Sequence, residues 1–267
     1  MMLPGENTFA RLCKEELSRV KEREGIGLYK EKRLHSVLKR WICDDLTAHE
    51  QKIASRDGKP SRFVADVLTP WGEIAEIQTG SLYPLLKKLT FYLDQTDHPV
   101  TVVHPLIAEK TVCWIDPESG ELKSRRRSPK HEGLLHAIAL LKPLTPLLGR
   151  ERLRFLFPVL EAEEYRLLDG WGREGKRGSH RYELFATRLL DAPILQTKQD
   201  FAALLPSSLP SPFTAKHFGN LTRLSGYPLY HALAVLESLD ILHRCGKQGR
   251  ATLFCKGMRE GGCENLF

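Results

Sequence analysis

The sequence predicts an α/β protein with a mixed sheet flanked by helices, followed by a small helical domain that ends in a hairpin. Apolar residues recur with helical spacing on both sides of two strand-like stretches in the first hundred residues. Further strand-like and helical segments alternate up to about residue 193, which favours a sheet covered by helices. After residue 196 the pattern changes to closely spaced short helices.

The composition is typical of a folded protein with a basic surface. The chain has 267 residues, of which 42% are hydrophobic, enough to bury a sizeable core. Lys and Arg outnumber Asp and Glu by 40 to 33, and the net charge of +7 favours a polyanionic partner. No run approaches the roughly 20 apolar residues that span a bilayer. We therefore expect a cytoplasmic protein with no membrane partner, whose scattered cysteines are reduced thiols.

Two helices are predicted at the start of the chain. Residues 1–27 form an N-terminal helical segment in which Phe9 and Leu12 lie on one apolar face, and Gly27 lies at its end. The same spacing continues over residues 28–43, "LYKEKRLHSVLKRWIC", and predicts a second amphipathic helix. This second helix begins the predicted α/β domain.

The α/β domain is predicted to extend over residues 28–193. Strand-like stretches at 62–68 and 73–79 flank the turn "TPWG", and a helix follows from about 81 to 94. The segment "PVTVVHPL" is typical of a buried strand, and "KTVCWIDPESGELKSRR" of a hairpin. A helix is predicted in "HEGLLHAIALLKPL" and strands in "RLRFLFPVLEAEEYRLL".

Two acids are predicted to face each other across the first hairpin. If the loop is 70–72 with Gly72 in the left-handed conformation, Asp66 falls opposite Glu76. Residues two apart share a face of a strand, so Gln78 points the same way as Glu76. Adjacent like charges repel, which favours a bound divalent cation such as Mg²⁺ or Mn²⁺ between the two acids. The alternative is a solvated hairpin face.

The flanking helices add a third acid and a lysine. Glu31 lies on the apolar stripe of helix 28–43, three residues before Leu34, and an acid on an inward face needs a partner. A helix cap or a salt bridge to a neighbouring lysine is the alternative for Glu31. Lys88 lies at the margin of the apolar face of the next helix, where it either supplies a cation to the acids or remains a plain surface lysine.

This succession of a helix, an Asp strand, a hairpin, a Glu-x-Gln strand, a helix and a strand resembles the core of the PD-(D/E)XK nuclease superfamily. The resemblance implies a restriction-endonuclease-like fold and Mg²⁺-dependent phosphodiester cleavage. It makes Asp66 and Glu76 metal ligands, Glu31 an auxiliary acid and Gln78 the third motif position. Gln78 replaces a lysine of the family pattern, and an amide can orient a water but cannot take its proton. Lys88 is then the candidate for a displaced cation.

A second resemblance covers most of the chain. The segments "EKRLHSVLK…EIQTGS…HP…RRRSPK" resemble those of an uncharacterised bacterial protein family, and this resemblance includes the C-terminal domain. This second resemblance implies no activity.

Three groups of basic residues are predicted to contact a nucleic-acid backbone, because lysine and arginine supply most phosphate contacts. The groups are Arg125, Arg126, Arg127 and Lys130 after the second hairpin, Arg173, Lys176 and Arg177 in a Gly-rich loop, and Arg244, Lys247 and Arg250 near the C-terminus. For the first group, a solvated turn is the alternative.

Residues 196–257 resemble a winged helix-turn-helix domain and are followed by a tail at 258–267. Thr197 is the predicted N-cap of a short helix, and two further helices precede two strands about a basic turn. A DNA reader offers polar and basic groups at the start of its third helix. Here Tyr227 and Tyr230 occupy that place. DNA and a protein partner, including a second copy of the chain, therefore remain equal alternatives for this domain.

Together these observations predict a nucleic-acid-binding protein that cleaves phosphodiester bonds with Mg²⁺ or Mn²⁺. DNA ranks ahead of RNA as the substrate. The alternative is a non-catalytic regulator or complex subunit that keeps the nuclease fold for binding.

Overall fold

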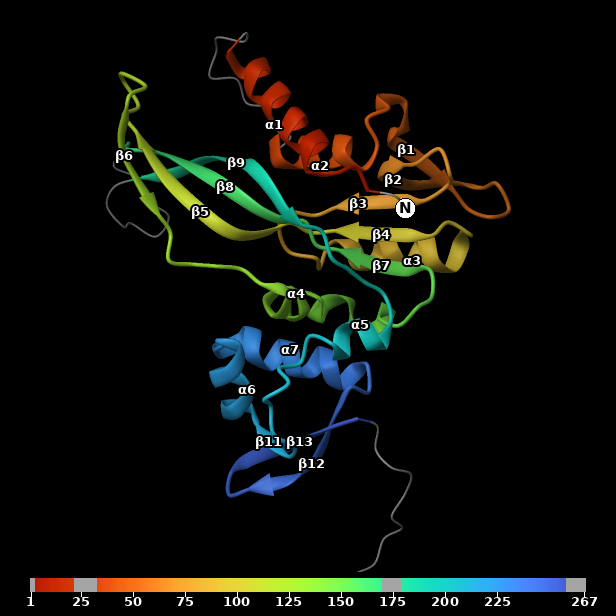
Figure 1. Ribbon diagram of the computed structural model, residues 1–267. Helices are drawn as coiled ribbons and strands as arrows, with labels where there is room; N and C mark the ends of the chain where they lie inside the picture. Colours follow the sequence, from red (N-terminus) through yellow and green to blue (C-terminus); the bar gives the residue numbers. More distant parts are fainter. Residues whose placement is uncertain (1–2, 22–32, 170–178, 258–267) are drawn as a thin grey trace, which may run out of the picture.

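A six-stranded mixed sheet with the order β1-β2-β3-β4-β7-β10 organises the first part of the chain (Figure 1). The computed structural model describes residues 3–21, 33–169 and 179–257. The strands of this sheet are β1 (His49–Ala54), β2 (Pro60–Leu68), β3 (Ile74–Ile77), β4 (Val100–Val103), β7 (Leu153–Leu156) and β10 (Ile194–Leu195). β1, β2 and β3 form an antiparallel meander, whereas β3, β4 and β7 run parallel.

Helices cover both faces of this sheet. α1 (Glu6–Lys21) and α2 (Arg33–Ile42) lie on one face, and α3 (Leu85–Gln95) and α4 (Leu134–Leu140) on the other (Figure 1). The apolar spacing read from the sequence is the reason, since it places the buried side chains of each helix toward the strands. The predicted α/β class, with a mixed sheet flanked by helices, is confirmed. None of the helices in the described ranges has the length and apolar character needed to cross a membrane.

Two strands of the first sheet continue into a second sheet with the order β6-β5-β8-β9. Its strands are β5 (Leu106–Ile115), β6 (Leu122–Arg127), β8 (Val159–Leu167) and β9 (His180–Asp191). The register is kept where β4 leads into β5 and β7 into β8, because Val103 pairs with Leu156 and Leu106 with Val159. Prolines at positions 105 and 158 lie opposite each other in the gap. The Leu106 N–H still donates to the Pro158 carbonyl at 2.8 Å, but Pro158 has no N–H, so the ladder lacks a bond there.

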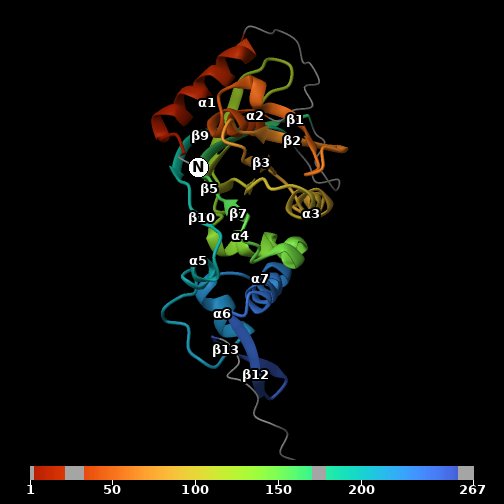
Figure 2. The same cartoon turned by 90° about the vertical axis from the view of Figure 1, so that its right-hand side faces the viewer.

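The C-terminal residues form helices and a small sheet with the order β11-β13-β12. The elements are α5 (Lys198–Ala202), β11 (Phe213–Thr214), α6 (Ala215–Thr222), α7 (Gly226–Ser238), β12 (Leu242–Gln248) and β13 (Ala251–Lys256). Thr197 caps α5 through a capping box, as predicted. α7 packs against α4 and the 3₁₀ helix η2 (Lys142–Leu147), so one apolar cluster extends from α3 to β13 (Figure 2).

The sequence does not predict strand β1. This strand reads "HEQKIA" and buries only Ile53, because it is the edge of the sheet and most of its side chains contact water. A second 3₁₀ segment, η1 (Leu46–Ala48), leads into it.

The expectation that all cysteines are reduced is wrong for one pair. Cys245 and Cys255 form a disulfide between β12 and β13. They are ten positions apart in the sequence, and the hairpin brings them together across the two strands. Cys13, Cys43 and Cys113 are free thiols.

Replacing Ile138 by Ala should lower the free energy of unfolding by about 2–5 kcal/mol, because Ile138 is fully buried in α4, which packs against α7. Leu140→Ala is the matched control in the same helix. Leu140 is 39% exposed, so its replacement should cost less than about 1 kcal/mol. Urea unfolding followed by tryptophan fluorescence measures both values. Equal destabilisation of the two variants would contradict this packing.

Candidate functional site

The β2–β3 hairpin places two acids opposite each other. Val67 pairs with Ala75, and this register puts Asp66 opposite Glu76, as predicted. Gly72 has a φ of 82°, the left-handed conformation that the predicted three-residue loop requires. The turn sequence therefore determines which two acids meet.

Glu76 is a buried carboxylate held by α3. It is 1% exposed, and its Oε2 lies 2.5 Å from the Lys88 ammonium. The Tyr92 hydroxyl donates to the other oxygen, Oε1, at 3.1 Å. Lys88 and Tyr92 are one helical turn apart, so both side chains reach the same carboxylate. Burial raises the pKa of Glu76 to about 7; the nearby Asp66 charge adds to the rise, and Lys88 opposes it.

Asp66 is held from the side of α2. Its Oδ2 accepts a hydrogen bond from the Ile77 N–H at 2.7 Å and lies 3.5 Å from Nε2 of His35. Burial alone would raise the pKa of Asp66, but His35, the Ile77 N–H and the Lys88 charge together lower it below its usual value. Oδ1 takes no hydrogen bond from any described residue.

Gln78 is engaged in the turn that follows β3. Its Nε2 donates to the carbonyl of Ser81 at 2.6 Å. Within the described ranges no hydrogen bond joins Gln78 to Asp66 or Glu76. Glu31, the predicted auxiliary acid, lies outside the described residues.

The two acids have the chemistry of a divalent-cation site. Mg²⁺ prefers oxygen ligands and keeps several waters, so two carboxylates fit it. In the described part of the chain, no group of three or more His, Cys, Asp and Glu side chains is arranged to hold a metal ion. Asp66 and Glu76 would therefore be completed by water, and Lys88 would have to share Glu76 with the cation or release it.

A second buried acid in the same hairpin shows what distinguishes Glu76. Glu73 accepts hydrogen bonds from Thr101, Arg154 and Trp71. Burial tends to raise the pKa of Glu73, but these donors lower it on balance. A buried acid with this many donors is a structural ion pair. Glu76 has fewer donors and faces another acid, which is typical of a functional site.

The predicted arginine run lies on β6, an exposed edge strand. Arg125 pairs with Glu163, and Arg127 pairs with Glu109. Arg126 forms no ion pair with a described residue. Of the three arginines, Arg126 is therefore the side chain most available to a phosphate.

The remaining predicted basic residues are dispersed. Arg173, Lys176 and Arg177 lie outside the described residues. Arg244 forms an ion pair with Glu237 at 2.8 Å. Lys247 and Arg250 are exposed near the tip of the β12–β13 hairpin, and no described residue pairs with either. The structure therefore does not gather these residues around the two acids.

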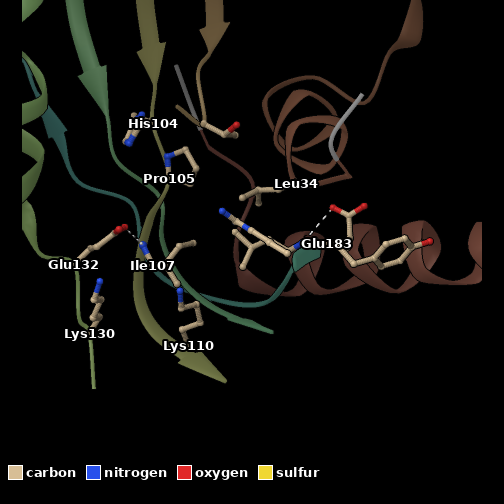
Figure 3. A pocket seen from close by; sticks show the side chains of 12 residues that line it. Leu34, His104, Pro105, Ile107, Lys110, Lys130, Glu132 and Glu183 are labelled. Atoms are coloured by element: carbon tan, nitrogen blue, oxygen red, sulfur yellow. Dashed lines mark hydrogen bonds between the residues drawn. The ribbon is translucent and has the colours of Figure 1, made fainter. Parts of the chain in front are cut away.

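A pocket of about 330 Å³ lies at the junction of the two sheets, beyond the carboxyl ends of β3 and β4 (Figure 3). Ligands of α/β proteins commonly bind beyond these ends of parallel strands. Lys130 lines this pocket together with His104 and Lys110. The sequence interpretation places Lys130 with the arginines, but its position brings it to the pocket instead.

Three residues of the site have no role in the sequence interpretation: His35, Tyr92 and Lys110. Tyr92 could have been found, because it lies one helical turn after Lys88 on the same helix. His35 and Lys110 carry no such signal, since their partners Asp66 and Glu164 are distant in the sequence.

In metal-free buffer, Glu76→Gln should change how stability depends on pH. The folded pKa of about 7 exceeds the unfolded value of 4.5, so the folded wild type holds a proton that the unfolded chain releases between these values. The free energy of unfolding of the wild type, measured relative to the variant, should therefore fall across this window. Each unit of difference between the folded and unfolded pKa corresponds to about 1.4 kcal/mol, so the total fall approaches about 3 kcal/mol above pH 7. Urea unfolding at about pH 5, 6, 7 and 8 measures it, and parallel profiles for the two proteins would refute the assignment.

Comparison with known proteins places the α/β part in a family. Residues 32–196 match the family described as a domain of unknown function (DUF8091). A protein of Treponema pallidum (strain Nichols), described as an uncharacterized protein, is 28% identical over 204 residues, which cover 72% of this chain and 75% of that protein. No solved structure matches the chain. The matched range includes Asp66, Glu76 and the pocket, and the chain belongs to the DUF8091 family.

Proposed function

We propose that this protein binds nucleic acid and cleaves phosphodiester bonds with a divalent cation, as PD-(D/E)XK nucleases do. The observation that carries the proposal is the pair Asp66 and Glu76 on facing positions of one hairpin, with Lys88 in contact with Glu76. Like charges at facing positions are costly unless a cation lies between or beside them. Lys88 beside Glu76 offsets part of this cost, and a divalent cation held by both acids would offset the rest.

The order of elements also supports the proposal. The succession that resembles the nuclease core, a helix, an Asp strand, a Glu-x-Gln strand, a helix and a strand, corresponds to α2, β2, β3, α3 and β4, with η1 and β1 between α2 and β2. β3 lies between β2 and β4, so its acid is central in the sheet and is flanked by helices on both faces. A central position excludes water and strengthens electrostatic interactions there.

Each side chain has a distinct role in the proposed reaction. Asp66 and Glu76 would hold the cation through their carboxylate oxygens. A bound Mg²⁺ would stabilise negative charge on the phosphate and lower the pKa of a water. Lys88 keeps Glu76 partly neutralised before the cation binds and provides positive charge beside the phosphate afterwards. His35 and the Ile77 N–H fix the Asp66 carboxylate in one orientation.

The runner-up is a non-catalytic binding subunit that keeps this fold. The observation that favours it is Gln78, which replaces the lysine of the motif and whose amide is bonded to Ser81. In this case Lys88 and Glu76 form a permanent ion pair, and the basic surfaces bind nucleic acid without cleavage. The two functions differ in activity and not in binding.

We interpret the C-terminal unit as a winged helix whose partner is a protein. Two helices followed by a hairpin, α6, α7, β12 and β13, have the order of that fold. The start of α7 presents Tyr227, 83% exposed, and Tyr230, and Arg244 of the hairpin is neutralised by Glu237. Exposed tyrosines are enriched at protein interfaces, whereas phosphate contacts need free cations. A protein partner or a second copy is thus favoured over DNA at this unit.

Purified protein should cleave plasmid or single-stranded nucleic acid with Mg²⁺ or Mn²⁺, and Asp66→Asn or Glu76→Gln should reduce cleavage to background. Removing either acid leaves one carboxylate to hold a strongly hydrated ion. Gln78→Ala should retain a measurable rate, because it removes a hydrogen-bonding group worth about 1–3 kcal/mol. Gln78→Lys should maintain or raise the rate.

Glu73→Gln is the matched control, because it neutralises a buried acid of the same hairpin that has other partners. It should retain cleavage per folded molecule. If wild type and Gln78→Lys are both inert while binding persists, the binding subunit is the correct function.

Neutralising Arg126 should weaken duplex DNA binding and flatten its salt dependence. The slope of log K against log salt should fall by about 0.9 for each phosphate that the variant no longer neutralises. Arg125→Gln should change it less, because Arg125 is paired with Glu163. Lys52→Gln is the control, since Lys52 is exposed on β1 and forms no ion pair with a described residue. An unchanged slope for Arg126→Gln would show that this side chain does not touch phosphate.

A further inference from the structure

We propose that the pocket at the junction of the two sheets binds a phosphate-bearing nucleotide, with the His104 imidazole as a buried hydrogen-bonding contact. The pocket is distinct from the cleavage site, because Asp66, Glu76 and Lys88 do not line it. The choice of phosphate among small anions rests on the proposed function. The preference for an anion does not, and it follows from the side chains described below.

His104 supplies an unsatisfied polar atom in the wall of the pocket. The residue is 6% exposed, and its Nδ1 is buried without a hydrogen-bond partner among the described residues. A buried polar atom left unpaired is costly, so a ligand that pairs with it gains affinity. Burial lowers the pKa of His104, although the Gln78 backbone and Glu132 oppose this. The imidazole is therefore neutral near pH 7, and its one N–H is directed at the Gln78 backbone, so Nδ1 is left as a hydrogen-bond acceptor for a ribose hydroxyl or a base N–H of the ligand.

The cations beside the pocket outnumber the acids that neutralise them. Glu164 is shared by Lys110 at 2.8 Å, Arg166 at 2.6 Å and Arg181 at 3.9 Å. One carboxylate cannot neutralise three cations. The Lys130 ammonium, which also lines the pocket, forms no ion pair with a described residue. An anion entering here therefore meets uncompensated positive charge.

The two acids of the pocket wall are already engaged. Glu132 accepts a hydrogen bond from the Ile107 N–H at 2.9 Å. Glu183 lies 3.7 Å from Arg33 and accepts from the Leu184 N–H at 3.2 Å. Figure 3 shows the Glu132 carboxylate turned toward the Ile107 N–H of β5. Neither acid reverses the positive charge that Lys110, Lys130 and Arg181 supply.

The dimensions and one aromatic ring indicate a single nucleotide. A volume of about 330 Å³ is near the lower end of small-molecule pockets, which are about 300–1,000 Å³. Tyr182 lines the pocket and is 47% exposed, so its ring offers a face on which a base can stack. A duplex is too wide for this space. The ligand is therefore a free mononucleotide or the phosphorylated end of a strand.

The sheet face next to the pocket is basic as well. Arg126 pairs with Val112, and Lys110 is two residues before Val112 on the same strand. Side chains two apart share a face, so Arg126 and Lys110 lie on one side of the second sheet. A strand whose end occupies the pocket would thus pass over positively charged residues.

Calorimetric titration of the metal-free full chain tests the proposal. Adenosine 5′-monophosphate, a 5′-phosphorylated dinucleotide and inorganic phosphate should bind, and adenosine should bind at least about tenfold more weakly than its monophosphate. The double variant Lys130→Gln, Arg181→Gln alters exposed side chains and should lower the affinity for the monophosphate by about tenfold or more. Tyr182→Ala should lower the affinity for the monophosphate by at least about fivefold and leave the affinity for inorganic phosphate unchanged. His104→Phe should weaken binding of the two nucleotide ligands, whose hydroxyl or base N–H groups can donate to Nδ1, more than binding of inorganic phosphate.

Lys52→Gln is the matched control and should bind as wild type does. Equal affinity of the double variant and wild type, or no binding of any phosphate ligand, overturns the proposal even if His104→Phe fails to fold. Tighter binding of the dinucleotide identifies a strand end as the ligand, and equal binding identifies a mononucleotide; both support a phosphate site. Monophosphate binding without nuclease activity overturns only the proposed function, and activity without such binding overturns only this inference.

Discussion

The interruption of the β-ladder at the prolines in positions 105 and 158 is the constraint on which the arrangement of this protein depends. β4 and β7 run parallel and continue as β5 and β8 in unchanged register. The Leu106 N–H bridges the junction to the Pro158 carbonyl at 2.8 Å, but Pro158 has no N–H to donate in return. A third proline, Pro193, lies opposite Phe157 where β9 leads to β10 and accepts its N–H through the carbonyl at 2.9 Å. The ladder is therefore weakened along one line, and His104 and the pocket lie on that line.

The same line marks the carboxyl ends of β3 and β4, so the pocket and the two acids are neighbours on one edge of the first sheet. Gln78 is the residue between them, because it follows the Glu76 strand and its backbone contacts the His104 imidazole. The two acids differ in environment. Helix α2 approaches Asp66 with His35, whereas α3 approaches Glu76 with Lys88 and Tyr92. The proposed cation site and the proposed phosphate pocket lie at one edge, where together they would form one surface for a nucleic-acid strand.

Much of the candidate site could be predicted because it depends on short-range geometry. The loop length and Gly72 fix the hairpin register, which makes Asp66 and Glu76 face each other. The position of Lys88 at the margin of an apolar helix face left two alternatives, a contact with the acids and a plain surface position, and the ion pair with Glu76 favours the first. The contacts of Gln78 could not be predicted, because its amide turns to Ser81 instead of the acids. Strand β1 could not be predicted either, because an edge strand needs little apolar surface.

The sequence by itself determined the α/β class, the hairpin and its facing acids, the cap at Thr197 and the order of the C-terminal elements. These depend on periodicity, turn residues and capping, which act over a few positions. Only the tertiary structure decided that His35 meets Asp66, that Lys110, Arg166 and Arg181 share Glu164, and that Cys245 bonds to Cys255. It also decided that α4 joins the C-terminal helices to the sheet. Long-range contacts of this kind arise from packing and burial, and local sequence patterns do not encode them.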